Sequence, residues 1–232
     1  MISAGRTRRE TAGAHRASGP QARAIAHRPL IAAGRNLLRE IKIAALHRRG
    51  GRAAKRLRDK RELKLHFGCG INKKLGWVNI DLHNGSDLQL DARRPIPLPD
   101  RCAAIVYSEH FFEHLEHPWE TNVFLNECFR LLRSNGLFSV GVPDTEWPLD
   151  ATADWIEQAK RHGWHDGCST KMERLNVHFR QAGEHKYAWD FETLEKTLQN
   201  AGFLNIRRRE FDPAVDSEWR AIGTLYVDAL RP

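Results

Sequence analysis

Two glycines and one acid in the middle of the chain have the types and spacing that binding of a nucleoside requires. Gly68 and Gly70 follow an alternating apolar segment directly, and Asp81 ends a second such segment shortly afterwards. Glycine lets a backbone turn sharply and lets a ligand approach where a side chain would block it. A carboxylate at the end of the second segment can accept hydrogen bonds from both hydroxyls of a ribose. These residues therefore predict a nucleoside-cofactor site.

The pattern departs from the fingerprint of dinucleotide-binding proteins. That fingerprint has a third glycine or alanine at the position that Lys73 occupies here. Only 10 residues separate Gly70 from Asp81, which leaves little room for a full crossover helix. A dinucleotide is therefore a weaker alternative than a single nucleoside.

A second group of reactive residues is His110, Glu113 and His114, which form an H-x-x-E-H pattern. One class of zinc peptidases carries this pattern. On a helix the two histidines would share a face and could bind zinc, with Glu113 as base. That site would need a third protein ligand, for which Glu127 is the only obvious nearby candidate. Alternatively, His110 is a general base, because histidine has a pKa near neutrality, or it only caps or packs against the following helix. His114 is then better explained as a packing or capping residue.

The elements that must position these residues alternate between strands and helices. Hydrophobic patterning predicts strands at 63–67, 77–81, 88–91, 103–107, 137–142, 203–211 and 221–230, and helices at 118–133 and 192–200. Ligands of open α/β sheets bind beyond the carboxyl ends of the strands. We therefore expect an α/β fold, with a doubly wound, Rossmann-like sheet of seven strands, one of them antiparallel.

Charge divides the chain into two parts. Residues 1–61 carry 17 Lys and Arg against 3 acids, or +14, whereas residues 62–232 carry 20 against 26, or −6. We predict a basic N-terminal arm over 1–61, with one amphipathic helix from Asn36 that ends at Gly50 and Gly51. The arm either packs on the body or contacts an anionic membrane surface. Nucleic acid is a disfavoured partner, because no aromatic residue precedes Phe67.

The four cysteines form no metal or redox pair, since no two of them are closer than 26 residues. They are expected to be free thiols in a reducing compartment. No apolar run approaches the roughly 20 residues of a membrane helix, and the first residues lack the apolar stretch typical of a secretory signal. A cytoplasmic protein is expected, although the Arg-rich start also fits an organellar transit peptide.

The body resembles the class I S-adenosylmethionine-dependent methyltransferases. The resemblance is closest to small predicted methyltransferases linked to cell-surface saccharide synthesis. Ordered motifs carry it over about 170 residues: Leu65–Gly70, Gly76–Leu82, Asp91, Leu98–Asp100, Tyr107–Leu115, Glu127–Gly136, Val142–Asp144 and Ala201–Phe203. One departure is Ser134-Asn135-Gly136, where the family usually has Pro-Gly-Gly; asparagine tolerates the left-handed turn conformation.

The resemblance implies roles by position. The cofactor is S-adenosylmethionine. Its contacts would be Phe67, Gly68, Cys69 and Gly70 along the methionine part, Asp81 on the ribose, Asp91 at the adenine amine, and Ser108 and Glu109 beside the transferable methyl group. The candidate catalytic residues are His110, Asp144, which closes the fifth strand, and His114.

Residues 145–189 are predicted to cover the substrate. They hold four tryptophans and four histidines: Trp147, Trp155, Trp164, Trp189, His162, His165, His178 and His185. No pair of these histidines has a spacing that indicates a metal, so no metal is predicted. We expect methyl transfer to an oxygen of a saccharide, a glycan or another small acceptor. The alternatives are a zinc-dependent hydrolase using His110, Glu113 and His114, or an inactive methyltransferase-fold binding protein.

Overall fold

The computed structural model describes residues 20–150, 161, 168 and 170–232. Contacts divide the chain into two compact units, Met1–Lys42 and Ile43–Pro232. The first unit is helical from Pro20 onward, as the first part of helix α1 (Pro20–Ala54). Among the described residues, no helix is both long enough and apolar enough to cross a membrane.

Helix α1 corrects the prediction that Gly50 and Gly51 end a helix that starts at Asn36. The helix begins at Pro20 and continues through both glycines to Ala54. A Cβ atom on Gly50 would lie 2.2 Å from the main-chain oxygen of Gln89, so glycine is required there by close packing. Gly50 is therefore explained by a tertiary contact. From the sequence alone, the same glycine is interpreted as the end of a helix.

The last turns of α1 belong to the second unit. Ile43 and Ala54 are buried, and the Asp91 N–H donates a hydrogen bond to Nδ1 of His47 at 3.2 Å. The body therefore starts near Ile43, whereas the sequence placed its boundary between residues 61 and 62. A short 3-10 helix, η1 (Lys55–Leu57), leads from α1 to the first strand.

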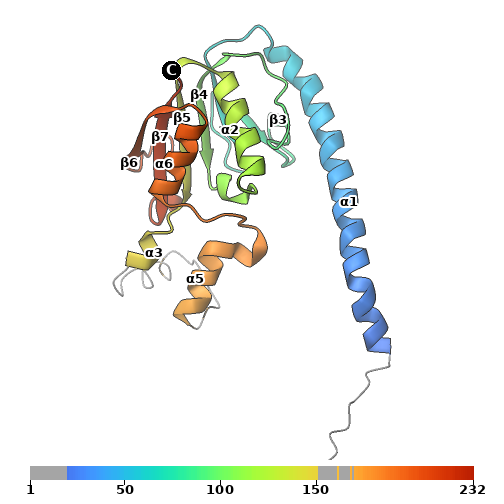
Figure 1. The fold of residues 1–232 in the computed structure, drawn as a ribbon. Coiled ribbons are helices and arrows are strands. Elements are labelled where there is room, and N and C mark those ends of the chain that lie inside the picture. The colour runs from blue at the N-terminus through green and yellow to red at the C-terminus, as the bar shows by residue number, and fades with distance from the viewer. Residues whose placement is uncertain (1–19, 151–160, 162–167, 169) are drawn as a thin grey trace, which may run out of the picture. The chain divides into compact units, whose positions relative to one another are not determined.

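A seven-stranded sheet forms the centre of the second unit (Figure 1). Its order is β3-β2-β1-β4-β5-β7-β6, and every neighbouring pair is parallel except those made by β7. The strands are β1 (Leu63–Phe67), β2 (Val78–Asp81), β3 (Leu88–Gln89), β4 (Ala103–Glu109), β5 (Leu132–Pro143), β6 (Leu204–Arg209) and β7 (Thr224–Leu230). The predicted α/β fold, with seven strands and one antiparallel strand, is confirmed.

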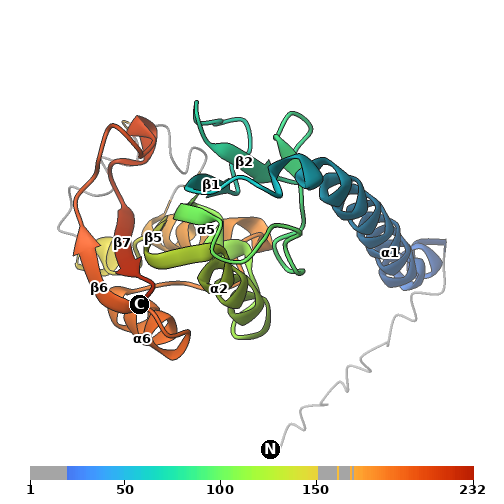
Figure 2. The same cartoon turned by 90° about the horizontal axis from the view of Figure 1, so that it is seen from above.

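Helices α2 (Trp119–Leu131) and α6 (Phe191–Asn200) lie on the same face of the sheet (Figure 2). They match the helices predicted at 118–133 and 192–200. Aromatic rings fill the space beneath them, with Phe124 of α2 edge-on to Phe67 at a centroid distance of 5.2 Å. This packing anchors the strand ends that carry the candidate site.

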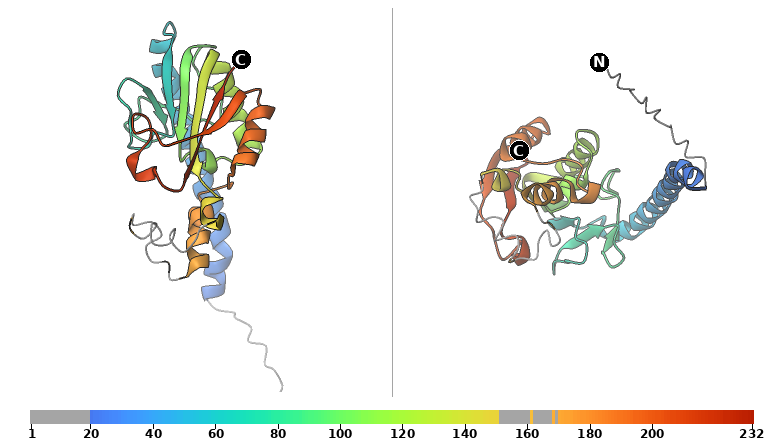
Figure 3. Two further views of the ribbon diagram at one scale, coloured as in Figure 1. Left: turned by 90° about the vertical axis from the view of Figure 1, so that its left-hand side faces the viewer. Right: turned by 90° about the horizontal axis from the view of Figure 1, so that it is seen from below.

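The predicted substrate cover contains α3 (Trp147–Asp150), α5 (Lys171–Arg180) and η3 (Gln181–Gly183). Helix α5 lies beyond the carboxyl ends of the parallel strands, at the opposite end of the sheet from the C-terminus (Figure 1, Figure 3). The ring of Trp189 is fully buried and stacks on Phe112 at 4.9 Å, so this tryptophan belongs to the core. Four of the highlighted residues lie outside the described part: Trp155, Trp164, His162 and His165.

Candidate functional site

The turn after β1 contains two glycines with different structural roles. Gly68 has φ of +69°, and a Cβ atom there would lie 2.4 Å from Cβ of Phe111. Gly70 has φ of +49°, but a Cβ atom there would have nothing within 4 Å. Gly68 is therefore needed for packing, whereas Gly70 faces open space that a ligand can enter.

The residues beside these glycines offer mainly backbone atoms to a ligand. The Phe67 ring is buried in the core, and the Cys69 side chain is also buried. Burial, followed by the negative charges of Asp81 and Asp87, raises the pKa of the Cys69 thiol to about 12. Cys69 is thus a neutral thiol at physiological pH.

Asp81 at the end of β2 meets the glycine turn, as the sequence predicted. Its Oδ2 accepts a hydrogen bond from the Gly70 N–H at 2.8 Å, and its Oδ1 accepts one from the His83 N–H at 2.7 Å. A carboxylate offers about four lone-pair sites, so each oxygen can accept a further hydrogen bond. The acid is therefore oriented by the backbone and keeps the capacity to bind ribose hydroxyls.

Asp91 is buried and held by two arginines. Its carboxylate accepts hydrogen bonds from Nε of Arg93 at 2.9 Å and from Nε of Arg94 at 3.0 Å. Burial alone would raise the pKa of Asp91, but the hydrogen bonds and charge of Arg93 outweigh it and lower the pKa. The proposed contact of Asp91 with adenine stays a prediction.

The end of β4 contributes Ser108 and Glu109, which have contrasting surroundings. Ser108 is fully buried, and its hydroxyl has no hydrogen-bond partner among the described residues. The Glu109 carboxylate accepts hydrogen bonds from Oγ of Ser217 at 2.6 Å and from the Tyr226 hydroxyl at 3.1 Å, and it lies 3.6 Å from Arg220. Glu109 therefore fastens the segment before β7 to the end of β4.

His110 follows directly and adopts φ of +51°, which is uncommon for a residue other than glycine. Its Nε2 lies 2.8 Å from Oγ1 of Thr224, and its Nδ1 lies 3.7 Å from Oε1 of Glu113. Burial and the nearby positive charge of Arg220 hold the pKa of His110 well below its usual value. The imidazole is neutral at physiological pH and is held by its contact with Thr224.

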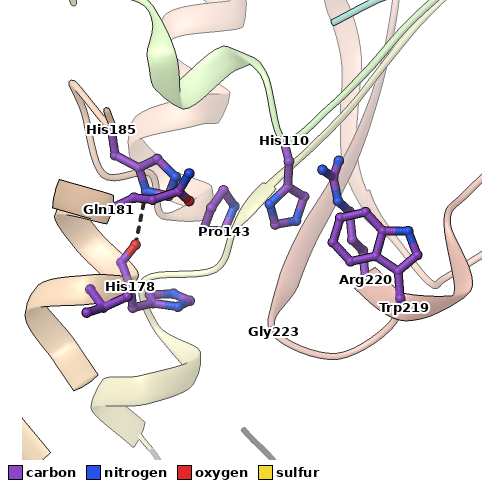
Figure 4. A pocket seen from close by; sticks show the side chains of 9 residues that line it. His110, Pro143, His178, Gln181, His185, Trp219, Arg220 and Gly223 are labelled. Carbon is purple, nitrogen blue, oxygen red and sulfur yellow. Dashed lines mark hydrogen bonds between the residues drawn. The ribbon is translucent and has the colours of Figure 1, made fainter. Parts of the chain in front are cut away.

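A cavity of about 340 Å³ opens beside His110 (Figure 4). In this view the His110 ring lies between the histidines of the α5–η3 segment and the Trp219–Arg220 pair of the segment before β7. The guanidinium of Arg220 covers the Trp219 ring at 4.1 Å. The lining residues come from four parts of the chain: His110, Pro143, Val177, His178, Gln181, His185, Trp219, Arg220 and Gly223.

Asp144 ends the fifth strand, as predicted, but its atoms serve the backbone nearby. Its Oδ1 accepts a hydrogen bond from the Glu146 N–H at 2.9 Å, and its own N–H donates to Gly223 at 3.0 Å. Its carbonyl oxygen lies 3.0 Å from Nε2 of His178. The catalytic role predicted for Asp144 stays a prediction.

The predicted zinc arrangement of the H-x-x-E-H pattern does not form as a helical pair. Phe112–His114 is a single 3-10 turn, η2, and His110 precedes it in a left-handed conformation. Glu127 is paired with Arg130 at 2.7 Å and accepts the Ile96 N–H at 2.6 Å, so it is engaged elsewhere. Sequence spacing missed His185, whose ring joins Glu113 and His114 instead.

Part of the region that forms these strand ends matches a known family. Residues 50–140 match the family described as a methyltransferase domain. The match covers less than half of the chain. A probable S-adenosylmethionine-dependent methyltransferase of Mycolicibacterium smegmatis is 35% identical over 68 residues. Those residues make up 29% of this chain and 23% of that relative, so the chain matches about a quarter of the relative's length.

Two solved structures are also similar to this chain. A methyltransferase from Archaeoglobus fulgidus is 18% identical, with a TM-score of 0.48, over 83% of this chain and 94% of that one. Phosphoethanolamine N-methyltransferase 2 of Haemonchus contortus, solved with S-adenosylmethionine, is 12% identical, with a TM-score of 0.43, over 80% and 52%. The fold assignment rests on the strand order described above, not on these likenesses.

Proposed function

We propose that the protein transfers the methyl group of S-adenosylmethionine to an oxygen of a small acceptor, and that this acceptor is a saccharide or a glycan intermediate. The observation that carries the proposal is the adjacency of two features. Gly70 and Asp81 follow β1 and β2, and the cavity beside His110 opens after β4. Phe67 and Ser108 are paired in register on β1 and β4, so both features lie at one sheet edge.

The residues at this edge fit the proposed cofactor. Gly70 leaves its surroundings open, Asp81 is oriented with spare lone pairs, and the buried Ser108 hydroxyl lacks a partner among the described residues. A buried hydroxyl without a partner is uncommon and points to a ligand or water beside it. We assign Asp81 to the ribose hydroxyls, and the Gly68–Gly70 backbone to the methionine part.

When bound, S-adenosylmethionine supplies an electrophilic methyl group on a sulfonium. His110 would accept the proton of the acceptor hydroxyl, whose oxygen would take the methyl group while the carbon–sulfur bond breaks and S-adenosylhomocysteine leaves. The ring suits this task because it is neutral, lines the cavity and is held by Thr224. A base of this kind contributes roughly 10²–10⁴-fold, and positioning of the acceptor contributes more.

The saccharide assignment is supported by the chemistry of the cavity wall. The half-exposed Trp219 offers a flat face of the kind that packs against sugar rings, and Arg220 beside it can bind hydroxyls or phosphates. His178 and Gln181 line the opposite wall. This wall is amphipathic, as a sugar requires.

We also propose that the basic segment 1–61 contacts anionic membrane surfaces peripherally. Its charge of +14 supports this, since each basic residue near such a surface contributes roughly 1 kcal/mol. Sedimentation with phosphatidylserine vesicles should recover the full chain, and raised salt should release it. Equal recovery with neutral vesicles would count against the proposal.

Calorimetric titration with S-adenosylmethionine and S-adenosylhomocysteine tests the cofactor assignment. We expect micromolar binding to the full chain and loss of binding in Asp81→Ala, with the circular dichroism spectrum unchanged. Asp100→Ala is the matched control, because Asp100 is an exposed acid paired with Arg130. Unchanged affinity in Asp81→Ala would overturn the assignment. Saccharide acceptors are then screened by release of S-adenosylhomocysteine.

A further inference from the structure

The carboxylate of Glu113 is buried without a hydrogen-bonding partner. The residue is 2% exposed, and neither of its side-chain oxygens has a hydrogen bond among the described residues. Its main chain is hydrogen-bonded by contrast, since the Glu113 carbonyl oxygen accepts the Lys186 N–H at 2.7 Å. Buried carboxylates in proteins are paired, protonated or bound to a metal. The unpartnered carboxyl group is therefore either protonated or neutralised by a cation that the protein binds beside it.

Three histidines place a nitrogen near this carboxylate, and the first, Nδ1 of His110 at 3.7 Å, belongs to a ring that already bonds to Thr224. Nε2 of His114 and Nε2 of His185 each lie 3.9 Å from Oε1 of Glu113, too far for a direct hydrogen bond. The two rings are 5.0 Å apart and nearly perpendicular. Three potential donor atoms thus converge on one small volume, and all three lie within 4.8 Å of one another.

The outer nitrogens of both rings fix the form of these histidines. Nδ1 of His114 lies 3.1 Å from the Glu184 carbonyl oxygen, and Nδ1 of His185 lies 3.0 Å from that of His178. A carbonyl only accepts hydrogen bonds, so each Nδ1 carries the proton. In the neutral rings, each Nε2 then presents a lone pair toward Glu113. Metal-bound histidines are oriented in this way by outer hydrogen bonds.

We propose that Glu113, His114 and His185 bind a divalent transition-metal ion, with Zn²⁺ the best fit to two imidazole nitrogens and one carboxylate. Such ions take these ligands at about 2.0–2.2 Å, so the three side chains need only a small inward movement. A cavity of about 10 Å³ beside Glu113 and His185 has room for roughly one water-sized ligand at a fourth position.

Binding would connect two distant parts of the chain. Glu113 and His114 follow β4 in η2, whereas His185 follows η3. The same η3 region carries Gln181 and His185, which line the cavity beside His110. We infer that the metal holds this wall against the sheet edge. The inference does not depend on the identity of the methyl acceptor.

The test is metal content and zinc affinity of the full chain without an affinity tag. Elemental analysis should find about one zinc per chain after dialysis. Competition with a chromophoric chelator should give a single tight site in the chain stripped of metal. Glu113→Gln and His185→Asn should weaken zinc binding roughly 100-fold or more, since even outer-sphere changes cost 10–100-fold. His83→Asn, at an exposed histidine outside the group, should leave affinity unchanged.

Cobalt substitution of the wild-type chain tests the site without any variant. Co²⁺ bound by two imidazoles and a carboxylate should give intense visible absorption, and one equivalent of Zn²⁺ should remove it. The proposal is overturned if the chain binds no zinc stoichiometrically, if Glu113→Gln binds as tightly as wild type, or if Co²⁺ shows only the spectrum of the hydrated ion. S-adenosylmethionine titration in parallel keeps the two proposals separate, because cofactor binding rests on Gly70 and Asp81.

Discussion

The candidate site lies at the carboxyl ends of the parallel strands, and its two halves are built in different ways. The half after β1 and β2 comes from one short stretch, in which the Gly70 N–H binds the Asp81 carboxylate directly. The half after β4 and β5 brings His110 together with Thr224 and with the Trp219 wall, more than 100 residues away. The difference teaches that a local motif can form the proposed cofactor site, whereas the proposed catalytic side depends on the completed fold.

Replacing His110 should have the largest effect, because it should lower turnover without weakening cofactor binding. We expect His110→Asn to lower kcat roughly 10²–10⁴-fold, the range for loss of a general base. Asparagine tolerates the left-handed backbone that His110 adopts, so the fold should persist. Steady-state kinetics with an identified acceptor and calorimetry with S-adenosylmethionine measure the two effects.

The matched control is His117→Asn, at a half-buried histidine that contacts Tyr187 and does not line the cavity. It should leave kcat within a few-fold of wild type. If His110→Asn instead weakens cofactor binding as much as turnover, the division of the edge into two independent halves is wrong.

The two glycines sharpen the comparison within the cofactor half. Gly68→Ala should destabilise the chain by roughly 2–5 kcal/mol, because the new methyl group meets Phe111 and the backbone is left-handed. Gly70→Ala should cost only about 1–2 kcal/mol, since its surroundings are open, yet it should weaken S-adenosylmethionine binding. Urea unfolding and calorimetry distinguish the outcomes. Equal stability losses would show that both glycines serve packing.

Acid should weaken the strands beneath the cofactor half through His66 of β1. Burial, with the positive charges of Lys74 and Arg220, lowers the pKa of His66 to about 4, although a hydrogen bond with Asn79 opposes the shift. Unfolded histidine titrates near 6.5, so the contribution is fully present above pH 6.5 and is lost as pH falls toward 4. The loss should reach about 3 kcal/mol.

Comparison of wild type with His66→Gln isolates this effect from other buried histidines, such as His185, whose pKa is also lowered to about 4. Urea unfolding at about pH 7.5, 5.5 and 4.5, which covers most of the interval between about 6.5 and about 4, should give a shallower pH dependence for the variant. Identical slopes would exclude His66 as a source of acid sensitivity.

The smallest expected effects concern the packing of α1 on the strand that flanks Asp81. Gly50→Ala should destabilise the second unit by about 1–3 kcal/mol, because its Cβ would meet the Gln89 main chain. Gly51→Ala meets only Pro97 at 3.4 Å, so it should stabilise by about 0.5–1 kcal/mol through helix propensity. Thermal unfolding of the two variants measures whether each substitution lowers or raises stability. A stabilising Gly50→Ala would contradict the close approach of Gly50 to the Gln89 main chain.

The sequence predicted seven strands, one of them antiparallel, and the placement of Gly70 and Asp81 at neighbouring strand ends, because these follow from local patterning and from the rule for parallel strand ends. It did not predict that Glu109 binds Ser217 or that Trp189 enters the core. Nor could spacing place His185 beside Glu113, since a loop after α5 makes that contact. Residue types reveal chemistry at short range, whereas contacts across the chain depend on tertiary packing.

The position of β7 in the sheet determines when the sheet can be completed during synthesis on the ribosome. It inserts between β5 and β6, so β6 has no partner in the sheet and β5 keeps an open edge until Thr224–Leu230 emerges. Exposed strand edges invite pairing with other chains. The sheet therefore keeps unpaired strand edges until β7 forms, and His110 gains its Thr224 partner at the same step.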